Sequence, residues 1–312
     1  MNERTQEAST EPATVSEATP RRAIVALVLG LVSLGLSPIL VRYGTSAPGL
    51  ALAVWRTVFA TALLAPIALP RIGPEVRRFT GRDWRLILGA GVFLGIHFIA
   101  WIESLYHTSV ASASVLVTTS PLFIAVLGYL VLKERLTRRT VGAIVVAVIG
   151  AALIGWGDAA DEAFPNAILG NGLALTASLL MAVYLLIGRA VRQHTSFLAY
   201  LFPLYATAAV TILIVALVQG TPLAQPWPIL ALCLAMAILP QLIGHGSFNY
   251  AVKYFPAALL GLLSLSEPVF AAGLAFVLFG EAPGPLAVVG IAVVLGSLAV
   301  VFAPRLRRAQ RR

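Results

Sequence analysis

The chain has 312 residues, of which 59% are hydrophobic and 11% charged, and its net charge is +9. This composition excludes an ordinary soluble domain, and the basic residues flank apolar segments instead of gathering on one soluble face, which argues against nucleic-acid binding. The sequence carries no metal-ligand cluster, Walker lysine loop or GxSxG motif. No catalytic residue, metal or cofactor is therefore expected.

Residues 1–22 are polar, rich in Ser, Thr, Glu and Pro, and predict a disordered cytoplasmic tail. Arg21 and Arg22 precede an apolar segment that superficially resembles a secretory signal. That segment has no obvious small-residue cleavage site and is followed by further apolar segments. We therefore interpret it as the first membrane helix.

Apolar segments of about 20 residues, long enough to cross a bilayer, recur almost to the C-terminus. They predict an all-α integral membrane protein with ten transmembrane helices, near residues 23–41, 49–70, 84–106, 110–132, 141–156, 167–187, 199–219, 228–251, 257–279 and 285–303.

The distribution of Lys and Arg predicts the orientation. With both termini in the cytoplasm, 20 of the 22 basic residues fall in cytoplasmic segments, including the basic tail 304–312. Arg42 falls outside and Arg56 lies within a span. Residues 157–166 carry acidic residues and no Lys or Arg, as expected of an external linker.

Two similar segments indicate an internal repeat. PLFIAVLGYLVLKE begins at Pro121 in the fourth span, and PVFAAGLAFVLFGE begins at Pro268 in the ninth. Because the two segments are an odd number of spans apart, their halves would cross the membrane in opposite directions. We predict two inverted five-helix repeats, over residues 23–156 and 167–303.

The stretch TSVASASVLVTTSPLFIAVLGYLVLKERLTRRTVGAIVVAVIGAALI resembles an EamA-type half of the drug/metabolite transporter superfamily. IGHGSFNYAVKYFPAALLGLLSLSEPVFAAGLAFVLFGE resembles the same end of the second half. The resemblance covers nearly all of residues 23–303. It implies a ten-helix carrier with a central substrate cavity, usually exporting small metabolites or drugs across the bacterial inner membrane.

Glu267 and Pro268 interrupt the apolar ninth span. A buried ionisable group is expected to face protein or water, and Pro268, like Pro121, predicts a helix kink. Glu267 is a candidate for substrate binding and proton coupling; the alternative is a neutral side chain hydrogen-bonded to another helix. Ser264 would line the same substrate site, and so would Ser120, which occupies the Glu267 position in the first half.

Arg56 lies within the second span, where the resemblance to EamA-type transporters implies an Arg, and it is a candidate ligand for a substrate carboxylate. The alternatives are an ion pair or a clamp on carbonyl groups that fixes the bundle, or snorkelling to the interface. Glu103, at similar depth in the third span, is the expected ion-pair partner and a further candidate for proton coupling.

Gln241, His245 and Asn249 recur at every fourth position of the eighth span, near one helix face. His245 and Asn249 are candidate substrate ligands, and His245 is also a candidate for proton coupling; the alternative is a packing role. Trp101 and Tyr184 are candidate walls of the substrate site.

Glu134 and Glu281 end the fourth and ninth spans. We interpret both as structural residues, which cap the next helix or pair with the Arg cluster.

We therefore expect an inner-membrane carrier that exports a small organic metabolite, such as an amino acid or a related compound, or a drug, by alternating access. An uncoupled facilitator or exchanger is the alternative, and a membrane enzyme or a structural or sensory membrane protein is a remote one. The expected partners are the small-molecule substrate and the lipid bilayer, with no nucleic acid. The sequence leaves open whether the carrier forms a homodimer.

Overall fold

The computed structural model describes residues 21–132, 137–159, 162–247 and 265–309, and these ranges contain helices and no strand. The first half of the chain forms α1 (Arg21–Gly35), α2 (Ser37–Tyr43), α3 (Gly49–Val76), α4 (Gly81–His107), α5 (Val110–Val117), α6 (Ser120–Leu132) and α7 (Arg138–Ala159). The second half forms α8 (Ala167–Val191), α9 (Phe197–Val218), α10 (Trp227–Met236), the π-helix η1 (Ala237–His245), α13 (Ser266–Phe279) and α14 (Pro285–Ala309).

Eight helical segments in the described ranges are long and apolar enough to cross a membrane, and they correspond to the first eight predicted spans. Ser266–Phe279 and Pro285–Val300 are shorter apolar helices at the positions of the last two. The predicted start of the ninth span lies in residues 248–264, outside the described residues. The count of ten therefore stays a prediction.

Three of the spans are interrupted next to a proline. Pro38 lies at the start of α2, Pro121 at the start of α6, and Pro240 inside η1. Between α5 and α6 the hydroxyls of Thr118 and Thr119 donate to carbonyl groups three residues earlier, at 2.8 and 2.6 Å. The Leu116 carbonyl also accepts the Thr119 backbone N–H at 3.2 Å. Side-chain and backbone donors thus supply partners to carbonyl groups at the break, which a lipid environment requires.

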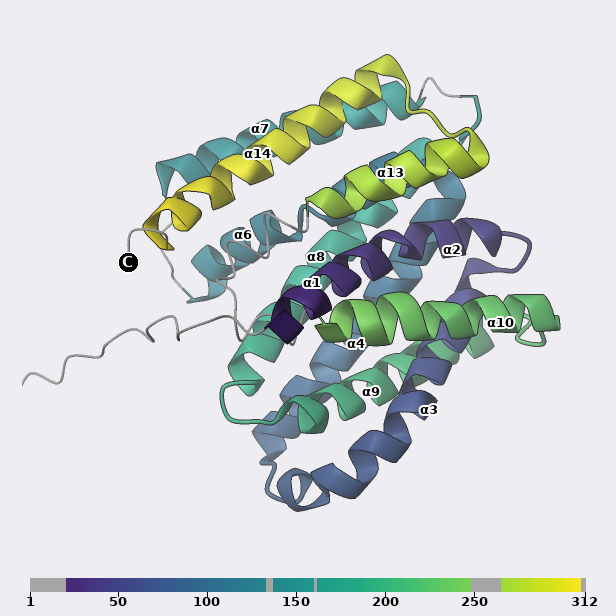
Figure 1. The fold of residues 1–312 in the computed structure, drawn as a ribbon, viewed down its shortest axis with the longest axis vertical. Coiled ribbons are helices and arrows are strands. Elements are labelled where there is room, and N and C mark those ends of the chain that lie inside the picture. The colour runs from purple at the N-terminus through teal and green to yellow at the C-terminus, as the bar shows by residue number, and fades with distance from the viewer. Residues whose placement is uncertain (1–20, 133–136, 160–161, 248–264, 310–312) are drawn as a thin grey trace, which may run out of the picture.

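The two halves of the chain interleave (Figure 1). α3 packs against α9, α4 against α8, α7 against α14, α5 against α13, and α1 against η1. Exchanging helices for their counterparts in the other half leaves the α3–α9 and α7–α14 pairs unchanged and converts the α4–α8 pair into the η1–α1 pair. The counterpart of α5 lies within residues 248–264, outside the described residues. The packing thus follows the two-fold relation that the sequence repeat predicts.

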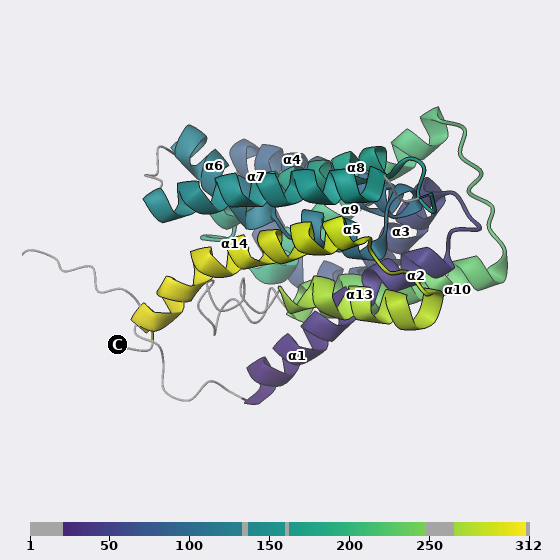
Figure 2. The same cartoon turned by 90° about the horizontal axis from the view of Figure 1, so that it is seen from above.

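A glycine seam joins α7 and α14, which lie side by side in both ribbon views (Figures 1 and 2). We define it by Gly150, Gly157 and Gly290. A Cβ atom on Gly290 would lie 2.6 Å from the Gly150 carbonyl oxygen and 2.7 Å from the Ile154 nitrogen, so the two backbones touch. Gly157 meets Ala287 near the start of α14, which shows that the helices run antiparallel, as inverted halves require.

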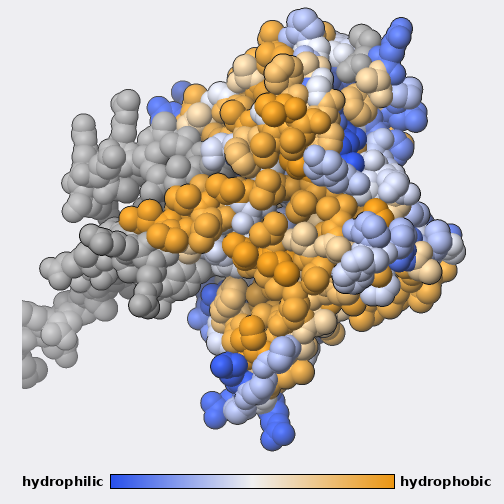
Figure 3. All heavy atoms as spheres, turned by 45° about the vertical axis from the view of Figure 1, so that its right-hand side comes forward, coloured by the Kyte–Doolittle hydropathy of each residue, from blue (hydrophilic) through white to orange (hydrophobic). Residues whose placement is uncertain are grey.

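The outer surface of the bundle is apolar. Figure 3 shows hydrophobic residues over much of one face, with hydrophilic residues mostly toward its edges. On α7, Val148 is 64% exposed and Ile149 is 53% exposed. Exposed aliphatic side chains on this scale mark a surface that lipid covers.

We predict that Gly290→Ala lowers the thermal stability of the detergent-purified protein. The new methyl group would meet backbone atoms of α7, which cannot rotate away, so we expect a loss of about 1–3 kcal/mol. Gly296→Ala, on the same helix with no atom within 4 Å of its Cβ position, is the matched control. Equal melting temperatures for both variants would contradict a seam of direct backbone contact.

Candidate functional site

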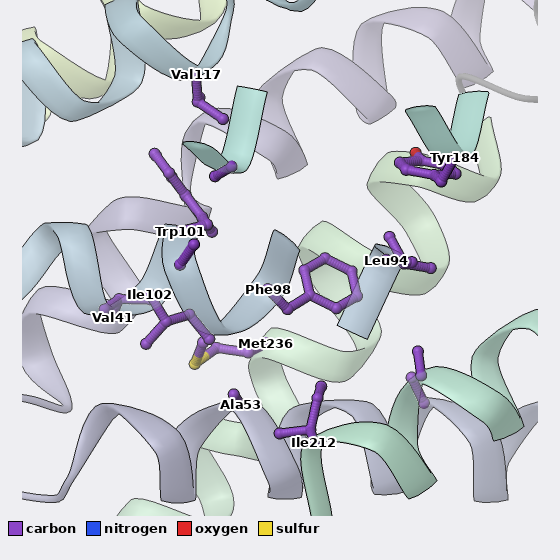
Figure 4. Packing of buried hydrophobic residues seen from close by; sticks show 14 of the residues in the cluster. Val41, Ala53, Leu94, Phe98, Trp101, Ile102, Val117, Tyr184, Ile212 and Met236 are labelled. Carbon is purple, nitrogen blue, oxygen red and sulfur yellow. The ribbon is translucent and has the colours of Figure 1, made fainter. Parts of the chain in front are cut away.

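The most deeply buried cation among the described residues is Arg56 of α3, which is 1% exposed. Its guanidinium carbon lies 4.4 Å from the ring centroid of Phe98 on α4, a cation–π contact. Phe98 is itself 1% exposed, and Figure 4 shows it among Leu94, Ile102 and Met236 in the hydrophobic core. Arg56 is therefore held in the interior of the bundle and does not snorkel to an interface.

Gln241 of η1 is the hydrogen-bond partner of Arg56. The Arg56 Nε group donates to Gln241 Oε1 at 3.0 Å. On the other side of Gln241, the Tyr205 hydroxyl of α9 donates to its backbone carbonyl at 3.4 Å. Gln241 follows Pro240 in the π-helix, an irregular form of helix that is often found at functional sites.

Phe98 and His245 bring the two halves of the chain together at this point. Their ring centroids are 6.3 Å apart in an edge-to-face arrangement. The interval between residues 98 and 245 equals the interval between Pro121 and Pro268, which marks the sequence repeat. Phe98 and His245 therefore occupy equivalent positions of the two repeats, and the Arg56 cluster lies where the pseudo-two-fold axis passes.

His97 and Tyr184 extend this cluster toward α8. The His97 Nδ1 group donates to the Ala177 carbonyl at 2.8 Å, because a carbonyl oxygen only accepts. The rings of His97 and Tyr184 are 6.4 Å apart, and both side chains are buried. We call Arg56, Phe98, Gln241, His245, His97, Tyr184 and Tyr205 the central cluster.

The expected ion pair between Arg56 and Glu103 is wrong. No ion pair between them exists, and the described partners of Arg56 are the neutral groups of Gln241 and Phe98. The Glu103 carboxylate lies instead against Gly49, where a Cβ would be 3.0 Å from Oε2. Glu103 follows Phe98 on α4 by about 7.5 Å along the helix axis, and it points about 140° away.

The other predicted site residues are spread over the bundle. Trp101 is buried in the hydrophobic core near the central cluster, and Ser120 is buried at the start of α6. Glu267 lies partly buried in the first turn of α13, and it has no hydrogen bond or ion pair within the described ranges. Asn249 and Ser264 lie outside the described residues.

Sequence reasoning did not select Phe98 and Tyr205. Phe98 is an apolar residue on an apolar helix, and Tyr205 is a tyrosine in a membrane span, so neither residue type by itself indicates a functional site. Phe98 could have been found from the sequence repeat, because it occupies the position equivalent to that of His245 in the other half.

A second polar cluster closes one end of the bundle. The Arg42 Nε atom lies 2.6 Å from Glu281 Oε1, and Arg42 also donates to the carbonyl groups of Leu105 and Thr108. Glu281 Oε2 accepts the backbone N–H of Val110 at 3.1 Å. The ion pair therefore connects the end of α2 with the junction of α4 and α5 and with the loop after α13.

This geometry corrects the expectation for Glu281. It caps the start of α5 and not the next helix, α14, and its cationic partner is Arg42 and not the Arg cluster. Glu134, its counterpart in the repeat, lies outside the described residues.

The opposite end is tied by loop contacts. His194, in the loop after α8, contacts Asp83 at 2.8 Å, and Glu75 Oε1 accepts the backbone N–H of Ser196 at 2.6 Å. These contacts join the end of α3 and the start of α4 to the α8–α9 connection. Polar bonds thus hold the bundle together at both ends, with the central cluster between them.

An interleaved bundle of apolar helices with a buried polar cluster at its two-fold axis is the architecture of a multi-pass membrane transporter. The chain belongs to the EamA-like transporter family, which it matches twice, over residues 21–156 and 168–303.

Curated relatives agree with this family, and a solved structure shows a similar fold. The chain is 30% identical over 286 residues to a "probable terminal-alkyne amino-acid exporter" of Streptantibioticus cattleyicolor, covering 90% of this chain and 93% of that protein. It is 24% identical to an uncharacterized transporter of Archaeoglobus fulgidus, covering 89% and 95%. A crystal structure at 21% identity has a TM-score of 0.63 and covers 92% of this chain and 99% of its own, which shows the same fold.

We predict that Arg42→Gln destabilises the protein more than Glu281→Gln. Arg42 bonds two carbonyl groups and a carboxylate, whereas a glutamine at position 281 can still accept from Val110 and Arg42. We expect losses of about 2–3 and about 1 kcal/mol, measured by thermal unfolding in detergent. Arg71→Gln, which removes an exposed side chain, is the control. The opposite ranking would show that the Glu281 charge dominates this cluster.

Proposed function

We propose that the protein is an inner-membrane carrier that exports a small organic metabolite, an amino acid or related compound, or a drug, by alternating access. The central cluster is the observation that carries this proposal. It combines a buried cation, hydrogen-bonding groups and aromatic walls from both repeats at their common axis. Two similar halves that rock about such a point expose it to each side of the membrane in turn.

The polar clusters at the two ends fit this cycle. A carrier must close one end while the other is open, so bonds at the ends have to break and form again. The Arg42–Glu281 pair crosses from one repeat to the other, which makes it suited to this role. By the distribution of basic residues it would lie at the outer end, with both termini in the cytoplasm.

The substrate class is inferred from the similarity to a named relative and from an acidic group in an apolar helix. The similarity to a protein named as an amino-acid exporter favours amino acids or related compounds. Glu267 stays a candidate for proton coupling, because it is an acidic group inside an apolar helix. Ser120, in the equivalent position, makes the two repeats unequal there.

The test is release of a labelled panel of amino acids, nucleosides and cationic drugs from proteoliposomes that contain the purified protein. Selective release of one class supports the carrier. A rate that is independent of an imposed pH gradient favours the uncoupled facilitator. Absence of release from folded protein, for every compound, would contradict the proposed function.

For a compound whose release the pH gradient accelerates, we predict that Glu267→Gln abolishes that acceleration. Glutamine has nearly the same shape but cannot take up a proton, so the carrier would lose its coupling while the helix keeps its packing. Glu162→Gln, in the exposed α7–α8 loop, is the matched control and should behave as wild type. An unchanged response to the gradient in Glu267→Gln would exclude this residue as the proton site.

A further inference from the structure

Two hydrogen-bond donors in the central cluster have no partner. Arg56 Nη1 and Gln241 Nε2 each expose less than 1 Å² to solvent, and neither has a hydrogen-bond partner among the described residues. The side chains to which they belong are joined by the Arg56–Gln241 hydrogen bond of 3.0 Å, so both donors belong to one small region. Buried donors of this kind are costly and are rare unless a ligand or water satisfies them.

The charge of Arg56 likewise has no anionic partner among the described residues. The ion pairs in the described part of the chain are Arg42–Glu281 and His194–Asp83, and neither includes Arg56. The contacts with Phe98 and Gln241 stabilise a guanidinium group without neutralising it. A buried cation normally has an anionic partner, and the protein supplies none among these residues.

A carboxylate matches the two donors and the charge of Arg56. Its two oxygens are strong acceptors, its single negative charge equals that of one guanidinium, and planar Arg–carboxylate pairing is favourable. A phosphate dianion would leave a buried negative charge. The Phe98 ring lies 4.4 Å from the Arg56 guanidinium carbon and 6.3 Å from the His245 ring, so aromatic groups border the two donors.

We propose that Arg56 Nη1 and Gln241 Nε2 bind the carboxylate of the transported molecule. The inference rests on the proposed carrier function and deepens it. It makes the carboxylate an obligatory part of the substrate, so that the carrier accepts acids, including amino acids, and rejects the amides and decarboxylated amines of the same size. Gln241, on the irregular helix η1, is the residue that presents the second donor.

The first arm of the test uses the substrate. Proteoliposomes are loaded with a panel of labelled amino acids, and the amino acid that is released fastest is compared with its amide and its decarboxylated amine. We expect the acid alone to be carried, and an excess of the unlabelled acid, but of neither analogue, to compete. Amide or amine carried as fast as the acid would overturn the carboxylate assignment while leaving the carrier function intact. Competition by phosphorylated analogues in place of acids would overturn it as well.

The second arm uses Gln241→Glu, which places a permanent carboxylate beside Arg56. The new charge would neutralise the guanidinium and take the place of the substrate carboxylate, so we expect amino-acid release to fall about tenfold or more. The melting temperature should stay the same or rise, because the buried cation gains a partner. Gln193→Glu, the same change in the exposed α8–α9 loop, is the control and should leave release unchanged.

The outcomes of the second arm are distinct. Wild-type release from folded Gln241→Glu would overturn the inference and leave the carrier function standing. If Gln241→Glu fails to fold, Gln241→Met removes the Nε2 donor without adding charge, and unchanged release from it would overturn the inference equally. A folded wild-type protein that carries nothing in the panel would overturn the proposed function, and the carboxylate assignment with it.

Discussion

Hydrocarbon offers no hydrogen-bond partner to a backbone, and this constraint explains where the structure is regular and where it is not. The lipid-facing segments, such as α7, are unbroken helices with exposed aliphatic side chains. The breaks lie inside the bundle: Thr119 is 3% exposed and Pro240 is buried. The π-helix that contains Pro240 also carries Gln241, the hydrogen-bond partner of Arg56. The polar centre thus occurs where protein, and not lipid, surrounds an irregular backbone.

The sequence predicted the class of fold and most of the spans, because the length of an apolar run is itself the physical requirement for crossing a bilayer. It also pointed to Arg56, since a charge in such a run is conspicuous. It did not predict the partners of Arg56. The depth of a residue along a span does not specify the direction in which its side chain points around the helix axis. Glu103 therefore looked like a suitable ion-pair partner for Arg56, although it points away from the Arg56 side of α4. The actual partners, Phe98 and Gln241, are neutral, and the rule that opposite charges pair could not find them.

The repeat and its imperfections have different consequences. The shared features of the halves set the packing, since α3–α9 and α7–α14 each join a helix to its own counterpart. The differences set the chemistry. Arg56 comes from the first half, while Gln241, Tyr205 and Tyr184 come from the second, and Phe98 faces His245 across equivalent positions. A symmetrical scaffold therefore encloses a site to which the two halves contribute different groups: a cation from the first half and a neutral amide from the second. Such a site suits a substrate whose two ends differ chemically.

The glycine seam has a consequence for the surrounding lipid. In a bilayer, helices separate as readily as they associate unless close contact favours the pair. Any gap between the halves that faced the membrane would fill with acyl chains, which would then compete with the substrate for an interior lined by aromatic rings. At the seam, backbone atoms in direct contact at Gly150 and Gly290 leave no room for an acyl chain between the two helices. In the proposed alternating-access cycle, this contact would direct opening toward the two aqueous faces and keep acyl chains away from the interior.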